Sequence, residues 1–222
     1  MQNNCENHWV TVHLTLVVIL AGILFSGCLG TNPVTPTRFY VLTPAQYDNR
    51  LVSKTKGGNS QAPKISLEIA ALRLPQYLEK PQIVTRTSEN QLELAEYHQW
   101  GGNLRKNMTR VFARNMSILL STPHVSVTPF HPSTPSDFRI EVDVMQFEAD
   151  STGQVILSAQ WRLFRGRSGK PLSTRISDLK SPELKAPMDV GQTVTAMGEL
   201  LGEFCVILGQ EILIHVQETK AP

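Results

Sequence analysis

The stretch FRIEVDV at residues 138–144 alternates apolar and charged side chains without interruption. Successive side chains of a β-strand point to opposite faces, so this pattern predicts a strand with one buried and one solvated face. The alternation returns at residues 155–164 after a turn at Gly153, and residues 172–177 follow a second turn at residues 165–170. Three such strands joined by short turns predict an antiparallel meander.

Shorter segments rich in β-branched and aromatic residues predict further strands at residues 38–42, 64–70, 82–86, 92–97 and 124–128. The segment 64–70 alternates apolar and polar residues, which predicts a half-buried strand. Turn residues at 88–91 join the strands on either side into a hairpin.

Two segments carry apolar residues at steps of three and four, the spacing of one face of an α-helix. The first begins after a candidate cap, Asn103, and stops before Pro123, and the second runs from about Asp189 to Val216. Arg105, Lys106, Arg110 and Arg114 lie off the apolar stripe of the first helix. We interpret that basic side as the solvated face of a helix packed on a sheet; the alternative is a helix on a membrane surface. The fold class is therefore α/β.

The N-terminal region has the pattern of a bacterial lipoprotein signal peptide. An uncharged apolar run ends in Ser26 and Gly27, directly before Cys28. The run is shorter than the roughly 20 residues that a membrane-spanning helix needs. We expect residues 1–27 to be removed, Cys28 to carry diacylglycerol and an N-acyl chain, residues 28–37 to form a tether, and residues 38–218 to form the domain. The first ten residues contain no Lys or Arg, unlike a typical signal peptide, so an uncleaved anchor or a buried helix is the alternative.

Composition and motifs argue against several functions. Removing residues 1–27, which hold Glu6 and no Lys or Arg, raises the formal net charge only from +2 to +3, and the basic residues are dispersed, which disfavours nucleic-acid binding. Cys205 is then the single thiol left, and its place on the apolar helix face predicts burial.

We find none of the common catalytic motifs: no GxSxG, no HExxH and no CxxC. The segment GRSGK at residues 166–170 has the wrong spacing for a phosphate loop and is followed by Pro171. We disfavour a metal site at His98, His124 and His131, and we interpret Glu141 and Asp143 as solvated charges opposite Arg139 or Arg162. The sequence predicts no enzyme, no metal and no cofactor beyond the acyl groups on Cys28.

The segment LPQYLEKPQIVTR at residues 74–86, with YHQW at 97–100, resembles the PqiC/YmbA family of ABC-type transport auxiliary lipoproteins. The resemblance extends through FYVL at 39–42, FE at 147–148, Trp161 and the long C-terminal helix. Gln76, Lys80 and the glycines after Trp100 depart from the family pattern.

This resemblance implies a mixed β-sheet flanked by helices. It also implies an outer-membrane lipoprotein that faces the periplasm, since Leu29 follows Cys28. The implied role is a docking scaffold for an MCE-domain protein of an intermembrane lipid-transport system, arranged as a ring of copies. The alternative is a periplasmic module that carries lipid in its own cavity.

The segment 74–86 is a candidate partner contact because Pro75 and Pro81 stiffen a loop that places Tyr77 and Leu78. We include Trp100 in this candidate contact. A buried connector with Tyr77 in the core is the alternative.

Overall fold

The computed structural model describes residues 13–16, 35–47, 65–128, 135–166, 168–183 and 189–218. Residues 1–36 form one compact unit, and residues 37–222 form another, which is the domain. The predicted cleavage site, Cys28 and most of the predicted tether lie outside the described residues. Within the described residues, no helix has both the length and the apolar character needed to cross a bilayer.

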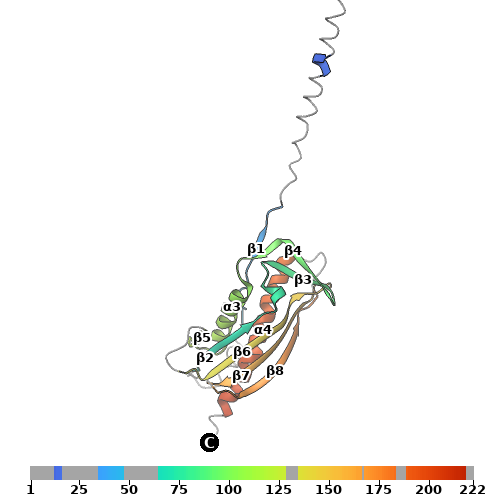
Figure 1. The fold of residues 1–222 in the computed structure, drawn as a ribbon. Helices are drawn as coiled ribbons and strands as arrows, with labels where there is room; N and C mark the ends of the chain where they lie inside the picture. Colours follow the sequence, from blue (N-terminus) through green and yellow to red (C-terminus); the bar gives the residue numbers. More distant parts are fainter. Residues whose placement is uncertain are drawn as a thin grey trace, which may run out of the picture. The chain divides into compact units, whose positions relative to one another are not determined.

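The domain is built on an eight-stranded mixed sheet with the strand order β1-β4-β3-β6-β2-β5, to which β7 and β8 are joined through β6 (Figure 1). β6 pairs in parallel with β2 and antiparallel with β7, and it touches β3 only where Thr85 pairs with Ala149. The strands are β1 (Arg38–Tyr40), β2 (Leu67–Arg73), β3 (Gln82–Ser88), β4 (Gln91–Trp100), β5 (Val125–Val127), β6 (Phe138–Ala149), β7 (Val155–Arg165) and β8 (Pro171–Lys180). The predicted β6–β7–β8 meander and β3–β4 hairpin are both confirmed.

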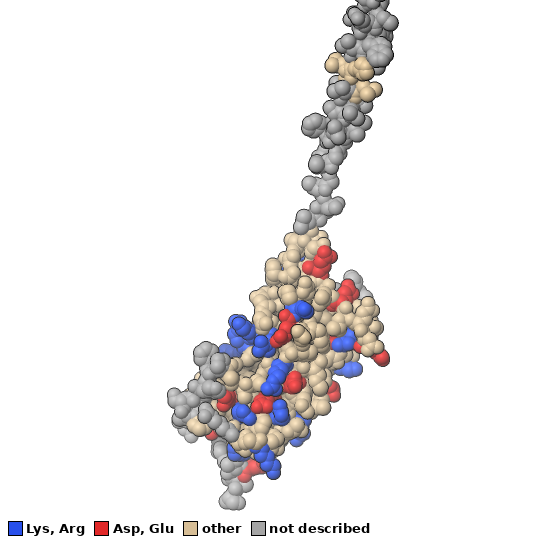
Figure 2. Space-filling view, in the orientation of Figure 1, with Lys and Arg blue, Asp and Glu red and all other residues tan. Residues whose placement is uncertain are grey.

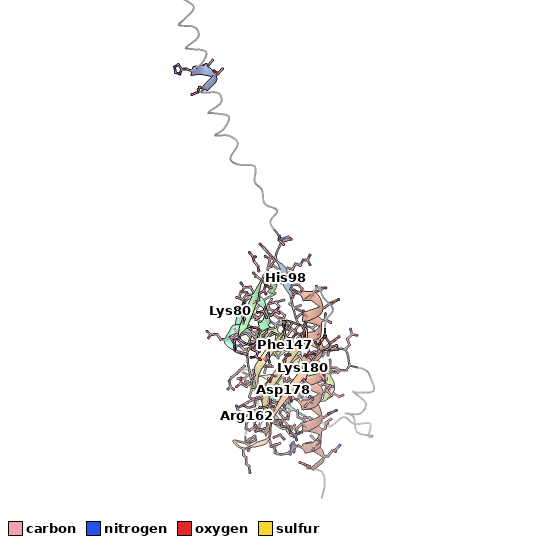
Figure 3. The ribbon with its side chains drawn as sticks, turned by 90° about the vertical axis from the view of Figure 1, so that its right-hand side faces the viewer. Lys80, His98, Phe147, Arg162, Asp178 and Lys180 are labelled. Atoms are coloured by element: carbon pink, nitrogen blue, oxygen red, sulfur yellow. The ribbon has the colours of Figure 1, made fainter. Side chains whose placement is uncertain are left out.

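Two long helices, α3 (Leu104–Leu119) and α4 (Val190–Glu218), pack against the sheet and each other. Figure 3 shows α4 running along the length of the strands, with His98 near the end of the domain where β1 enters. The rings of Phe112 and Phe204 lie 6.2 Å apart between the two helices. Asn103 caps α3 as predicted, since its side chain accepts a hydrogen bond from the Lys106 N–H at 2.9 Å. The fold is therefore the expected α/β arrangement.

The core follows the predicted patterns in the meander and departs from them in β2. The apolar face of β7 is buried along its whole length, and Cys205 on α4 is fully buried. The prediction of a half-buried strand at residues 64–70 is wrong for Glu68, which is only 5% exposed. β2 lies between β5 and β6, where Glu68 stands opposite Arg139, and a bulge between Ile69 and Ala71 shifts the alternation.

The segment after β1 crosses both helices. Asn107 on α3 binds both backbone groups of Leu42, accepting from its N–H at 2.7 Å and donating to its carbonyl at 3.2 Å. Asn115 accepts from the Ala45 N–H at 3.1 Å, and the Tyr47 hydroxyl donates to a carbonyl of α4 at 3.2 Å. The chain that enters from the N-terminal side is therefore fastened to both helices.

Candidate functional site

The segment 74–86 folds around one buried carboxylate, Glu148 at the end of β6. The segment begins with a short 3-10 helix, η2 (Gln76–Glu79), and Pro75 lies directly before its first residue. The Tyr77 hydroxyl donates to Glu148 Oε2 at 2.8 Å. From β3, Arg86 Nε donates to Glu148 Oε1 at 2.8 Å. Both ends of the segment are thus held by the same side chain.

Glu148 is only 1% exposed, so its charge needs these partners. The Phe147 N–H and the Gln146 amide complete the set of donors at 2.9 and 3.1 Å. Burial, together with the negative charge of Glu148, raises the pKa of the Tyr77 phenol, so the hydroxyl remains a donor. The two family-like segments, 74–86 and Phe147–Glu148, therefore form one polar cluster, which locks the connector onto β6.

The five predicted contact residues differ in exposure. Leu78 and Trp100 belong to the core at 2% and 6% exposed, whereas Pro75 and Tyr77 are half-buried and Pro81 is exposed. The core position of Leu78 fits the connector interpretation. The surface that a partner could touch consists of Pro75, Tyr77 and Pro81, and docking there stays a prediction.

An open groove of about 760 Å³ adjoins this segment, between the end of β2, the end of β5 and α3. Its apolar lining consists of the half-buried residues Ala70, Ala71 and Val127, backed by the core residues Ile69 and Leu72. The basic side chains of the groove are Arg73, Arg105, Lys106 and Arg110. Figure 2 shows Lys and Arg gathered over the region of α3 and β2. This groove suits an anionic group that also carries apolar surface.

Ion pairs between described residues neutralise one of the four cations. Arg105 pairs with Glu79 of η2 at 2.9 Å. No carboxylate among the described residues lies within ion-pair distance of Arg73, Lys106 or Arg110. Sequence reasoning placed Lys106 and Arg110 on an exposed helix face, but it did not bring Arg73 beside them, because β2 and α3 are joined only in the tertiary structure.

A Ser–His–Glu contact between β8 and α4 has some of the geometry of a catalytic triad. Ser173 Oγ lies 3.2 Å from His215 Nε2, and His215 Nδ1 lies 2.9 Å from Glu218 Oε2. However, the Ser173 hydroxyl donates its single proton to Glu211, which also accepts from Arg175 at 3.3 Å. In a triad that proton would point to the histidine. We therefore interpret the cluster as a polar clamp.

The other predicted polar groups lie at the surface or in the sheet. Glu141 contacts Arg139 and Arg162 at 3.3 and 3.2 Å, which confirms the predicted pairing. Its side chain is only 18% exposed, so the prediction of a solvated charge is wrong for Glu141, whereas Asp143 is exposed. His98 bonds the Tyr40 hydroxyl at 2.8 Å, and His131 lies outside the described residues. Among the residues that the structure describes, no three His, Cys, Asp or Glu side chains are grouped to hold a metal ion.

Comparison with known proteins identifies a family model and solved structures that are similar to this chain. The family model described as ABC-type transport auxiliary lipoprotein component matches residues 48–206. A crystal structure of a Xanthomonas campestris protein of family DUF330 is similar with a TM-score of 0.60 at 16% identity, covering 84% of this chain and 98% of that one. The crystal structure of an uncharacterized protein is similar with a TM-score of 0.51 at 22% identity, covering 70% of this chain and 95% of that one. These two likenesses show the fold. No curated protein matches.

Proposed function

Because the chain belongs to the family of ABC-type transport auxiliary lipoprotein components, we propose that it is a lipid-anchored accessory of an intermembrane lipid-transport system. In this proposal Cys28 carries the acyl groups, and the domain faces the periplasm from the outer membrane. The domain acts as a docking scaffold for an MCE-domain protein, in a ring of copies, and not as a catalyst.

The observation that carries the proposal is the fastening of the segment that follows the tether. β1 pairs with the last three residues of β4, and Asn107 and Asn115 then hold the backbone of the next turn of chain against α3. A scaffold has to keep its partner at a defined distance from the membrane. A tether of residues 28–37 would span at most about 36 Å if fully extended, and β1 begins directly after it.

The proposed docking surface in the segment 74–86 is formed by Pro81, which is exposed, and by Pro75 and Tyr77, which are half-buried. This segment is rigid, because Tyr77 and Arg86 both bind Glu148. A rigid loop loses little conformational entropy on binding, which favours its use as a contact.

The groove between α3 and β2 favours the alternative, a module that binds lipid itself. Its volume of about 760 Å³ and its apolar lining could receive part of a lipid. The groove opens to solvent, so acyl chains placed there would remain in contact with water. We therefore favour the scaffold.

A pull-down of the detergent-solubilised protein, read by mass spectrometry, tests the proposal. The wild type should recover an MCE-domain protein, Pro81→Glu should recover less, and Thr174→Glu on the exposed side of β8 should behave as wild type. Failure of the wild type to recover any MCE-domain protein refutes the scaffold. Phospholipid that co-purifies in a one-to-one ratio would support the alternative. Cys28→Ser should move the protein out of the membrane fraction.

A further inference from the structure

Several strand edges have no strand beside them among the described residues, including the outer edge of β8, which pairs only with β7, and parts of β4 and β2. β1 pairs only with His98–Trp100, so β4 has an open outer edge from Gln91 to Tyr97. At the other end of the strand order, β5 stops pairing at Ile69, while β2 continues to Arg73. Open strand edges are templates for pairing with another chain.

The β4 edge is acidic and carries exposed apolar side chains. Residues 88–97 contain Glu89, Glu93 and Glu96 and no Lys or Arg. Leu92 and Leu94 are 36% and 48% exposed. The β3–β4 hairpin projects from one end of the domain in Figure 1, and red side chains lie around it in Figure 2. This edge presents carboxylates and leucines together.

The β2 edge has the opposite charge. It forms one wall of the groove, in which Arg73, Lys106 and Arg110 have no carboxylate partner among the described residues. The half-buried residues Ala70, Ala71 and Val127 supply apolar surface there. The groove could therefore receive a strand that brings both carboxylates and leucines. The hairpin of the same chain cannot fill it, because β4 and β2 are separated by β3 and β6 in the sheet.

We propose that copies of this chain associate head to tail, with the β4 edge of one copy seated in the α3–β2 groove of the next. Leu92 and Leu94 then cover the apolar lining, and the negative charges of Glu93 and Glu96 on the same stretch of edge come close to Lys106 and Arg110. The contact joins two different surfaces, so it generates a ring if the rotation closes. The inference deepens the proposed ring by naming its surfaces, and it rests on that part of the proposed function.

A second copy is a better occupant than an acidic peptide or an anionic lipid headgroup. It supplies an unpaired strand edge for the open backbone of β2, which a headgroup lacks. It also supplies carboxylates and exposed leucines in one segment of known sequence. Anchoring of every copy to one membrane surface would raise the effective concentration of this occupant.

Charge reversal tests the pairing on the full lipidated protein in detergent, with mass measured by analytical ultracentrifugation. Glu93→Lys with Glu96→Lys, or Lys106→Glu with Arg110→Glu, should weaken self-association by at least about tenfold at low salt, because like charges would meet. Combining the four substitutions should restore it. The control pair Asp143→Lys with Lys180→Glu, both on exposed positions of other strands, should leave it unchanged.

Three results would overturn the proposal. The wild type could be a monomer at tens of micromolar, or its self-association could be unchanged by either charge reversal. The variant with all four substitutions could also stay dissociated although its circular dichroism spectrum is native. Binding to vesicles of anionic phospholipid by a monomer, lost only on reversal of Lys106 and Arg110, would assign the groove to a headgroup instead. A monomer that still recovers an MCE-domain protein would refute the contact between copies and leave the scaffold intact.

Discussion

Replacing Arg86 by Met removes the cation from a carboxylate that is 1% exposed. Glu148 keeps three donors, the Tyr77 hydroxyl, the Phe147 N–H and the Gln146 amide. The methionine retains most of the apolar stem of the arginine. The change therefore tests the charge pairing of the cluster with little loss of packing.

The expected cost follows from the burial of the two partners. Removing one member of a buried ion pair costs about 3–5 kcal/mol. The Arg86 side chain is 24% exposed and three donors remain on Glu148, so we expect about 2–3 kcal/mol here. For a domain of this size that corresponds to a fall in Tm of about 4–12 °C.

Urea denaturation followed by circular dichroism measures this loss, and a double variant separates charge from packing. Glu148→Gln keeps a carbonyl acceptor for Tyr77 and Phe147 but removes the charge. The variant Arg86→Met with Glu148→Gln should therefore be more stable than the sum of the single losses predicts, by at least about 1 kcal/mol.

Arg105→Met is the matched control. Arg105 and Glu79 form an ion pair of similar length, 2.9 Å, but their side chains are 50% and 37% exposed. This substitution should change the free energy of unfolding by less than about 1 kcal/mol. Equal losses from Arg86→Met and Arg105→Met, or strictly additive losses at Arg86 and Glu148, would refute the reasoning.

Three further outcomes can be measured. A Cβ at Gly202 would lie 2.4 Å from Ala45 Cβ, so Gly202→Ala should lower the free energy of unfolding by about 1–3 kcal/mol in urea titration, and adding Ala45→Gly should restore it. Gly169→Ala, where a Cβ would meet no atom within 4 Å, should be neutral, and equal effects of the two alanine substitutions would contradict the close packing. Burial raises the pKa of the Cys205 thiol, so peptide mass spectrometry should find it unalkylated by iodoacetamide at pH 8.5 in the folded protein and alkylated in urea, and labelling of the native protein would contradict this. Asn103→Ala should cost about 1 kcal/mol in thermal unfolding through loss of the α3 cap, and Asn103→Ser should retain most of it, whereas identical losses would exclude a capping role.

Local patterns were sufficient to predict the meander, the hairpin and both long helices. In these elements the buried face is set by side-chain periodicity, as in FRIEVDV, and the ends are set by nearby residues such as Asn103. The same reasoning failed at Glu68, because an inner strand with a bulge does not keep a solvated face. The lipidation of Cys28 stays a prediction from the sequence alone.

The sequence also singled out the two segments that form the Glu148 cluster, but it did not predict that Tyr77 and Arg86 meet Glu148 in space. That contact depends on β3 reaching β6 at Thr85 and Ala149, which is a matter of topology. The cationic groove likewise forms because β2 extends past the end of β5 beside α3. Sequence therefore determined which residues form strands and helices, because those choices depend on neighbours along the chain. Tertiary structure alone decided which charges are paired and which edges stay open, because these depend on residues about 30 to 70 positions apart.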